Sequence, residues 1–349
     1  MHRCVVFLLT VVFCSAAEPT SKANANLKRI LVRYPQADVN KDGVLTLTEA
    51  KAFQKKRQKR EVNRPMLKPT NSDISYGPHK RNRLDLWLVK SDEPTPLLVC
   101  IHGGGFKGGD KNKYQQQVGL IKRMHDAGIS VAAVNYRLTE GGKHPLPIAY
   151  HDCGRALQFL RHHAKKYNLD KLRFAATGGS AGACTLMWLA FHKNLADAEN
   201  SDPVLRESTR LVAIGPDNGQ PTLDPATFRK WFNTENLPEH PAMRAIYGLP
   251  GEGKIKWTQK LFAHARDISP ITHLTSEAPP CYMVYTAGDV PVDQSTRPGV
   301  WVHHPRLGIK LKEAMDKLGI ECHVQYKNGP PVKGYRDQQD FLIKKLTAK

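Results

Sequence analysis

The sequence pattern of residues 81–349 predicts an α/β domain in which helices cover both faces of a mainly parallel sheet. Two observations predict this fold class. Apolar, strand-like segments alternate along the chain with amphipathic helical segments, which is typical of a parallel sheet with helical crossovers. The 349 residues are 40% hydrophobic and 24% charged, a composition that suits a soluble globular protein with a substantial core.

The expected elements of this domain alternate in type from its start to its end. Strands are expected at 83–89, 96–102, 128–137, 172–178, 209–215, 281–288 and 321–327. Helices are expected at 148–167, 181–194, 306–319 and 336–346. An irregular stretch, 217–277, separates two of the strands.

The first 17 residues have the pattern of a secretory signal peptide. A short basic start precedes an apolar run from Cys4 to Cys14, and small residues then lead to an expected cleavage after Ala17. The run is too short to span a bilayer, and no later segment has the roughly 18 apolar residues that a transmembrane helix needs. We therefore expect a secreted or periplasmic protein. Lipid anchoring at Cys14 is less favoured, because Phe13 is bulky where a small residue is expected.

Cysteine content and charge exclude some functional classes. The signal peptide holds two of the seven cysteines, and the remaining odd number, widely spaced, argues against a disulfide framework. No zinc-ligand spacing is present.

The formal net charge is +20, with its densest cluster at 55–60. Such charge can steer anionic partners, but no nucleic-acid-binding motif accompanies it, so we expect a solvated helix end and no nucleic-acid partner.

Residues 38–49, DVNKDGVLTLTE, match the EF-hand calcium loop. The expected ligands at loop positions 1, 3, 5, 7, 9 and 12 are Asp38, Asn40, Asp42, Val44, Thr46 and Glu49. Gly43 allows the sharp turn at position 6. Helical patterns flank the loop, so we expect a single, small helical EF-hand over 24–60 and a linker over 61–80. Because EF-hands usually pair, this one is expected to bind a structural calcium weakly, to pack on the main domain, or to pair between chains.

One serine lies in a run of small residues, ATGGSAGAC, at 176–184. This run joins an expected strand to an expected helix. A G-x-S-x-G pattern in that context predicts Ser180 as a nucleophile on a sharp turn, with the N–H of Ala181 in an oxyanion hole. A second glycine run follows the strand that ends at His102, and its backbone N–H groups suit a developing oxyanion. That run lacks the Gly-Lys-Ser/Thr ending of a nucleotide-binding loop.

Together these motifs resemble the alpha/beta-hydrolases, in their HGGG-type esterase/lipase group. The matching segments are LDLWLV, IHGGGFKGGD, VNYRL, HPLPIAYHDCGRALQFLR and ATGGSAGA, and the resemblance covers roughly residues 80–347. The chain is similar to feruloyl-esterase-like and hormone-sensitive-lipase-like enzymes. The resemblance implies Ser180 as the nucleophile, with Gly104, Gly105 and Ala181 as the oxyanion donors.

The resemblance also implies the chain order serine, acid, histidine. The acid is expected after the strand at 281–288, where Asp289 is the first choice and Asp293 the second. The histidine is expected after the last strand. Lys333 occupies that position, and no histidine follows His323. This is the main departure from the family pattern.

Three explanations of the missing histidine remain open. In the first, the base is His303 or His304, with His304 slightly favoured; both precede an expected helix, on the same carboxyl edge of the sheet as Ser180. In the second, Lys333 is the base, with a pKa depressed by burial. In the third, the protein is a degraded hydrolase that binds without turnover.

The stretch 217–277 is interpreted as a cap over the site. Its aromatic residues either stack sugars or ferulate-like rings, or pack within the cap: Trp231, Phe232, Tyr247 and Trp257. We expect a secreted serine esterase that hydrolyses small-molecule or polysaccharide esters through an acyl-enzyme, with structural calcium and no organic cofactor. The alternative is a catalytically silent, calcium-stabilised module that binds a carbohydrate or a surface ligand.

Overall fold

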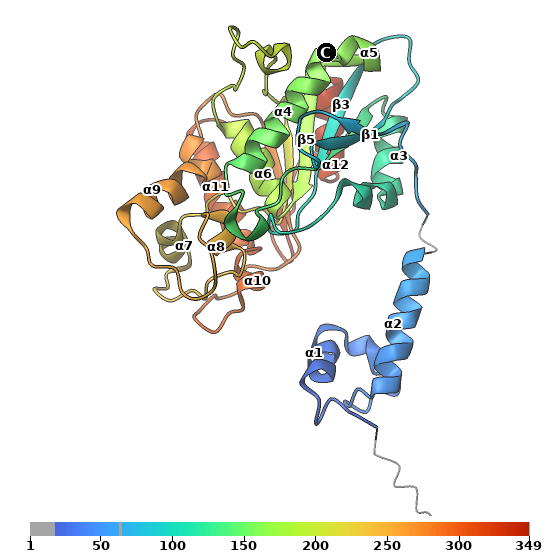
Figure 1. Cartoon of the computed structure of the whole chain (residues 1–349), viewed down its shortest axis with the longest axis vertical. Helices are drawn as coiled ribbons and strands as arrows, with labels where there is room; N and C mark the ends of the chain where they lie inside the picture. The colour runs from blue at the N-terminus through green and yellow to red at the C-terminus, as the bar shows by residue number, and fades with distance from the viewer. Residues whose placement is uncertain (1–17, 63–64, 349) are drawn as a thin grey trace, which may run out of the picture. The chain divides into compact units, whose positions relative to one another are not determined.

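The computed structural model describes residues 18–62 and 65–348. The chain divides into two compact units, Met1–Pro65 and Met66–Lys349 (Figure 1). The signal peptide predicted for residues 1–17 lies outside the described residues. None of the described helices combines the length and the apolar character that a membrane span requires.

The first unit is a helix–loop–helix. α1 (Ala25–Arg33) begins at Asn24, whose side chain accepts two backbone hydrogen bonds in the first turn. A short 3-10 turn, η1 (Pro35–Ala37), leads into the loop, and α2 (Leu47–Val62) follows it. The buried core of this unit consists of Leu27, Ala37, Leu45 and Ala50.

The loop of this unit pairs with the segment that precedes α1. Thr20 and Thr46 form an antiparallel bridge. The N–H of Ser21 donates to the carbonyl of Leu45 at 2.8 Å, and the Ser21 hydroxyl accepts from the N–H of Leu45 at 2.9 Å. Backbone groups of Leu45 and Leu47 are therefore paired within the unit.

The second unit contains one eight-stranded sheet in the order β1-β2-β4-β3-β5-β6-β7-β8. Its strands are β1 (Asn71–Ser75), β2 (Arg83–Trp87), β3 (Thr95–Ile101), β4 (Ser130–Val134), β5 (Leu169–Gly179), β6 (Ile214–Asp217), β7 (Cys281–Tyr285) and β8 (Cys322–Tyr326). β2 pairs antiparallel with both β1 and β4, and every other neighbouring pair is parallel. The predicted α/β fold with a mainly parallel sheet is confirmed.

The segment 61–80, predicted to be a linker, contains the edge strand β1. Four of the five residues of β1 are exposed, so the strand has no apolar alternation that would reveal it in the sequence. Polar contacts hold it in place. The N–H of Asp73 donates to Oδ1 of Asp85 at 2.8 Å, and Nζ of Lys111 lies 2.9 Å from Oδ1 of each of these acids.

Helices cover both faces of the sheet (Figure 1). One core lies under α4 (Ile148–His162), α6 (Ala181–Phe191) and α11 (Pro305–Lys317), and the other under α3 (Val118–Asp126) and α12 (Gln338–Thr347). Alternate residues of β3 belong to opposite cores. Val99 and Ile101 face the first, whereas Leu98 and Cys100 face the second. Both faces of β3 are therefore buried, which explains its continuous apolar sequence.

Between β6 and β7 the chain leaves the sheet and forms three helices. These are α7 (Pro225–Phe232), α8 (Met243–Ile246) and α9 (Gln259–Asp267), all within the stretch interpreted as a cap. The Phe228 ring packs edge-on against Trp301, with centroids 4.8 Å apart, and Tyr247 packs edge-on against Trp257 at 5.2 Å. Several aromatic side chains of this insertion thus pack against protein.

The remaining elements are short. They are α5 (Ala164–Tyr167), α10 (Pro298–Trp301), η2 (Lys111–Gln116), η3 (Glu140–Gly142), η4 (Pro203–Arg206) and η5 (Pro270–His273). All five cysteines of the described residues are buried and unpaired.

Candidate active site

Ser180 stands on the turn between β5 and α6. Its backbone has φ 53° and ψ −117°, a conformation that non-glycine residues rarely adopt. The turn is held by the N–H of Ser180, which donates to the carbonyl of Asp217 at 2.8 Å. The sequence pattern thus forms the sharp strand-to-helix turn that it predicts, with the serine at its apex.

Small residues are needed around this turn because three backbone segments meet there. A Cβ on Gly182 would lie 2.1 Å from the carbonyl oxygen of Ile101, and a Cβ on Gly178 would lie 2.5 Å from the same oxygen. Both distances are too short for real contacts. The end of β3 and the start of α6 can therefore approach each other only because these positions lack side chains.

His303 is the histidine that contacts Ser180. Its Nε2 lies 2.9 Å from Oγ of Ser180, and its Nδ1 lies 2.9 Å from the carbonyl oxygen of Gly299. A carbonyl can only accept, so Nδ1 carries the proton and Nε2 is the acceptor for the serine hydroxyl. The ring is thus in the tautomer that a general base requires.

Two hydrogen bonds hold the segment that carries His303. The indole N–H of Trp301 donates to the carbonyl of Pro238 at 3.1 Å. The side-chain amide of Gln220, which is buried, donates to the carbonyl of Val302 at 2.6 Å. His303 is therefore positioned by the connection between β7 and β8, at a place where that connection contacts the insertion.

His304, the slightly favoured candidate, does not contact Ser180. Its ring is fully buried and caps α11: Nδ1 accepts from the N–H of Arg306 at 3.1 Å. Its Nε2 lies 2.9 Å from the carbonyl of Val290. Both nitrogens are therefore occupied, and burial lowers the pKa of the ring. The structure thus places His303, and not the slightly favoured His304, beside Ser180, because His304 caps the start of α11.

Neither predicted acid contacts His303. Oδ1 of Asp289 lies 3.1 Å from Nη2 of Arg306 and 3.8 Å from Nδ1 of His304. Asp293 accepts hydrogen bonds within its own turn, from Ser295 and Thr296. The position that an acid would occupy, next to Nδ1 of His303, is taken by the backbone carbonyl of Gly299.

Lys333 does not reach the site either. Its side chain is exposed in the connection between β8 and α12, and it makes no hydrogen bond or ion pair in the described chain. A base role for this lysine depended on burial to depress its pKa. That condition is absent, so the structure gives no support to the second explanation of the missing histidine.

The glycine loop after β3 lies beside the serine. Gly105 and Ala181 line the same small pocket as Ser180, and within the described residues neither backbone N–H has an acceptor. Gly104 does not line that pocket; its carbonyl accepts from Lys107 and Gly108 and closes the loop. Two of the three predicted oxyanion donors are thus brought to Ser180.

His102 supports the glycine loop from behind. Its Nδ1 donates to the carbonyl of Gly103 at 2.8 Å, and the Tyr136 ring stacks on it with centroids 4.3 Å apart. Nη2 of Arg81 faces Nε2 of His102 at 3.4 Å and donates to the carbonyl of Gly109 at 2.9 Å. Burial lowers the pKa of His102 to about 4. The neutral ring and Arg81 therefore join the two ends of the loop together.

This histidine should make folding sensitive to acid. The pKa of His102 is about 4 in the folded protein against 6.5 for an ordinary histidine, so the unfolded chain binds more protons between these values. We expect its contribution to the free energy of unfolding, on the order of 3 kcal/mol, to be complete above pH 6.5 and to be lost as the pH falls to 4. Urea unfolding at a series of pH values measures this.

The His102→Asn variant provides the comparison. Asparagine keeps an amide donor near the Nδ1 position but does not titrate, so the variant should be less stable at pH 7 and lose less stability between pH 6.5 and 4. Equal losses in the two proteins over that range would contradict a role for His102 in the acid response.

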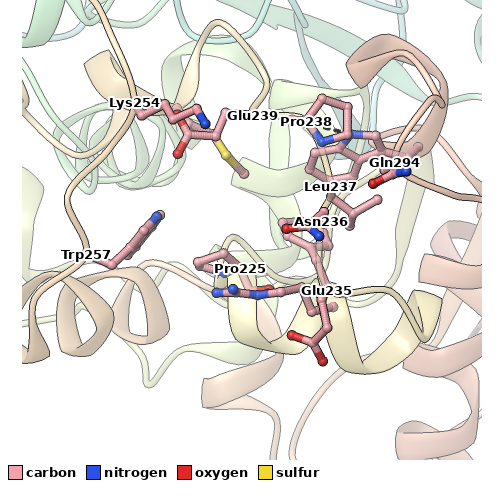
Figure 2. Close-up of a pocket in the computed structure, with 13 residues that line it drawn as sticks. Pro225, Glu235, Asn236, Leu237, Pro238, Glu239, Lys254, Trp257 and Gln294 are labelled. Carbon is pink, nitrogen blue, oxygen red and sulfur yellow. Dashed lines mark hydrogen bonds between the residues drawn. The ribbon is translucent and has the colours of Figure 1, made fainter.

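A small pocket beside Ser180 adjoins a larger pocket. The smaller, of about 40 Å³, is lined by Ser180 and by apolar side chains that include Leu223, Phe228 and Met243. The larger, of about 550 Å³, shares Phe228 and Met243 with it. Its other lining residues are mostly polar or aromatic and include Arg229, Glu235, Asn236, Glu239, Lys254, Trp257, Gln294 and Trp301. Figure 2 shows the Trp257 ring on one side of this pocket and Glu235 and Asn236 on the other.

The predicted calcium loop of the first unit is folded around its acidic side chains. Oδ2 of Asp38 accepts from the N–H of Gly43 at 2.9 Å, and Oε2 of Glu49 accepts from the N–H and the hydroxyl of Thr46 at 3.0 and 2.8 Å. The other oxygen of Asp38, Oδ1, is buried and has no hydrogen-bond partner. A bound cation would satisfy this oxygen, so the loop residues fit calcium.

One further group of side chains brings metal-ligating atoms together among the described residues. Atoms of His79, Glu140 and His144 lie within 4.8 Å of one another. Nδ1 of His79 accepts from the N–H of Arg81 at 3.1 Å, so the neutral ring keeps its proton on Nε2, the nitrogen left for a metal. Burial and the positive charge of Arg137 lower the pKa of this ring, and the same charge opposes a cation. We assign no metal to this group.

Sequence comparison relates the second unit to ester hydrolases. The BD-FAE family model matches residues 84–298. Over 236 residues the chain is 30% identical to the probable carboxylic ester hydrolase LipM of Mycobacterium tuberculosis, covering 64% of this chain and 50% of LipM. It is 31% identical to esterase LipQ of the same organism over 243 residues, again 64% and 50% of the two chains. The chain thus spans about half the length of these curated relatives.

Solved structures of esterases have the same fold. An acetyl ester-xyloside bifunctional hydrolase from Caldicellulosiruptor lactoaceticus aligns with TM-score 0.56 and 19% identity, over 76% of this chain and 88% of that one. A truncated carbohydrate esterase from gut microbiota aligns with TM-score 0.61 and 17% identity, over 81% and 98%. At these identities the likeness concerns the fold alone, which is the alpha/beta-hydrolase fold.

Proposed function

The chain belongs to the BD-FAE family, and we propose that it is a carboxylic ester hydrolase of the HGGG type with Ser180 as its nucleophile. The observation that carries the proposal is the 2.9 Å contact between Oγ of Ser180 and Nε2 of His303. A serine on a strained turn, bonded to a histidine whose other nitrogen is held, suits nucleophilic acyl transfer. This contact favours an enzyme over the silent binding module, which rested on the lack of a base.

In the first half of the reaction, His303 takes the proton of the Ser180 hydroxyl at Nε2 while the serine oxygen attacks the ester carbonyl carbon. The carbonyl electron pair moves onto its oxygen, and the N–H groups of Gly105 and Ala181 donate to that negative oxygen. The carbonyl of Gly299 keeps its hydrogen bond to Nδ1, so the ring stays oriented while it is positively charged.

In the second half, the bond between the carbonyl carbon and the alcohol oxygen breaks. His303 returns its proton to that oxygen, the alcohol leaves, and the acyl group remains on Ser180. Water then attacks the acyl-enzyme with His303 as the base. The carboxylic acid is released and the serine hydroxyl is restored.

The two pockets suggest the substrate class. A cavity of about 10–15 Å³ holds one water molecule, so the apolar pocket of about 40 Å³ beside Ser180 suits a short acyl group such as acetyl. The adjoining pocket of about 550 Å³, with its polar side chains and Trp257, suits a sugar as the alcohol portion. We propose short acyl groups on polysaccharide as substrates.

Acyl-chain preference tests the small pocket. We expect kcat/KM for p-nitrophenyl acetate to exceed that for p-nitrophenyl octanoate by about tenfold or more, although apolar burial alone favours the longer chain by about 0.8 kcal/mol per methylene. The Met243→Ala variant, which widens the pocket, should shift the preference towards longer acyl groups. A kcat/KM that rises steadily with chain length in the wild type would refute this pocket as the acyl site.

A serine-directed phosphonate tests the enzyme function itself. The wild type should be labelled at Ser180 by the reagent, as located by mass spectrometry, and the Ser180→Ala variant should not be labelled. If the wild type shows neither turnover of short esters nor labelling at Ser180, the esterase proposal fails and the binding module becomes the better description.

We also propose that residues 1–17 direct the protein out of the cytoplasm, since their sequence has the signal-peptide pattern and a polysaccharide substrate would be met outside. Mass spectrometry of the exported protein should find Glu18 as its first residue. Recovery of the uncleaved chain in the cytoplasm alone would contradict export.

We further propose that the first unit is an EF-hand that binds one structural calcium ion. The ligands would be the side chains of Asp38, Asn40, Asp42, Thr46 and Glu49 and the carbonyl of Val44. Calcium would join the two ends of the loop and neutralise its carboxylates. The partnerless Oδ1 of Asp38 supports this proposal most directly.

Calcium binding can be measured on the whole protein by isothermal titration calorimetry. We expect a dissociation constant on the order of 10⁻⁴–10⁻³ M and loss of the binding heat in Asp38→Ala, with kcat for ester hydrolysis unchanged within about twofold. Asp92→Ala, at an exposed acid of the second unit, is the matched control and should bind as the wild type does. Undiminished binding in Asp38→Ala would place calcium elsewhere.

A further inference from the structure

A second histidine, His240, lines the small pocket beside Ser180. It lies between α7 and α8 of the insertion. The N–H of Ala242 donates to Nδ1 of His240 at 3.2 Å, so this nitrogen is an acceptor. In the neutral ring the proton therefore resides on Nε2, which has no hydrogen-bond partner among the described residues. The site thus contains a side-chain donor that the mechanism above does not use.

The segment around His240 is fixed on two sides. The carbonyl of Pro238 accepts from the indole N–H of Trp301 at 3.1 Å, which ties this segment to the one that carries the base. On the other side, the methyl group of Ala242 lies 3.4 Å from the position that a Cβ on Gly105 would take. His240 is therefore held between the base and the oxyanion loop.

The surroundings of His240 keep its ring neutral. Burial lowers its pKa, the positive charge of Lys107 lowers it further, and His303 adds to this effect when that ring is protonated. Near pH 7 the ring is thus a hydrogen-bond donor rather than an acid. A neutral donor aimed at a developing negative charge stabilises the transition state without having to transfer a proton.

Two of the three backbone donors implied by the family resemblance line the same pocket as His240. Gly104, the third backbone donor implied by the family resemblance, does not line the pocket, whereas Gly105 and Ala181 do. Resting on the esterase function proposed above, we propose that His240 is a further catalytic residue whose Nε2–H donates to the carbonyl oxygen of the ester as that oxygen becomes negative. The oxyanion hole would then combine two backbone amides with one imidazole from the insertion.

Steady-state kinetics with p-nitrophenyl acetate tests this role. Removing one oxyanion donor lowers kcat by about 10²-fold or more, so His240→Ala should lose about that factor in kcat with KM changed by less than about threefold. His240→Gln, whose amide N–H reaches a position similar to Nε2, should recover most of the lost kcat. His264→Ala is the matched control, because His264 is a half-buried histidine of the same insertion that does not line the pocket.

Two results would overturn the role of His240. One is a kcat for His240→Ala within about threefold of the wild type. The other is a kcat for His240→Gln as low as that of His240→Ala when both variants have wild-type melting temperatures, since ring shape and not the donor would then matter. Both results are meaningful only when the wild type is active. Failure of the esterase proposal itself is a different outcome, because the wild type would then show neither turnover of esters nor labelling at Ser180.

Discussion

Replacing His303 with alanine should lower kcat for p-nitrophenyl acetate by about 10⁴-fold or more, with little change in KM. Nε2 of His303 is the ring nitrogen that lies 2.9 Å from Oγ of Ser180, and among the described residues no other side chain hydrogen-bonds to that oxygen. His303→Gln should lose about as much activity, because an amide can hydrogen-bond to the serine but cannot take its proton. Kinetics and the rate of phosphonate labelling at Ser180 measure the loss.

The neighbouring histidine is the matched control. His304→Ala removes a buried cap of α11, so the free energy of unfolding should fall by about 1–3 kcal/mol, while the folded variant keeps kcat within a few-fold of the wild type. Lys333→Ala should change neither quantity. A loss of kcat in Lys333→Ala as large as that in His303→Ala would show that the assignment of the base is wrong.

Gly182→Ala should lower the free energy of unfolding by about 3 kcal/mol or more. The added Cβ would lie 2.1 Å from the carbonyl oxygen of Ile101 and 2.9 Å from that of His102, so β3 and the start of α6 would have to separate. The separation would also move Ser180 away from the glycine loop, and kcat should fall by more than about tenfold. Urea unfolding and ester hydrolysis measure the two effects.

Gly179→Ala tests whether a steric clash of the added Cβ causes the destabilisation expected for Gly182→Ala. A Cβ at this position meets its nearest atom, the carbonyl oxygen of Asp217, at 3.9 Å, which is an ordinary contact. The free energy of unfolding should therefore change by less than about 1 kcal/mol. Equal destabilisation by the two alanines would mean that the close approach of Ile101 to Gly182 is not what limits this turn.

Most of the fold of the second unit follows from its hydrophobic pattern. Central strands such as β3 are buried on both faces and therefore stand out as apolar runs between helical segments. β1 could not be recognised in this way, because it is a polar edge strand held by Lys111, Asp73 and Asp85. These three residues are far apart in the sequence, and their contact exists only in the folded chain.

The serine turn is predictable because its pattern lies between a strand and a helix, and a local rule of helix capping also distinguishes the two histidines. Pro305 follows His304 directly, and proline favours the first position of a helix. His304 is therefore the N-cap of α11, and a ring that caps a helix is not free to act as a base. This local rule, applied to the sequence, favours His303.

Other parts of the site have no sequence signature. Gly299 acts through its backbone carbonyl, a group that every residue possesses, so no residue type could indicate it. The carboxylate of Asp289 has the expected place in the chain, but Arg306 pairs with it instead. His240 belongs to the insertion, and only tertiary packing brings it to Ser180.

His303, the base that we propose, lies in the connection between β7 and β8, whereas the family pattern puts the histidine after β8. Some genome surveys accept a hydrolase as an enzyme only when a histidine follows the last strand. Such a survey would classify this chain as a pseudoenzyme, although Nε2 of His303 lies 2.9 Å from Oγ of Ser180. Surveys that also accept a histidine in the preceding connection would retain it. Lys333, an exposed residue after β8, is then free to vary or to carry an engineered tether.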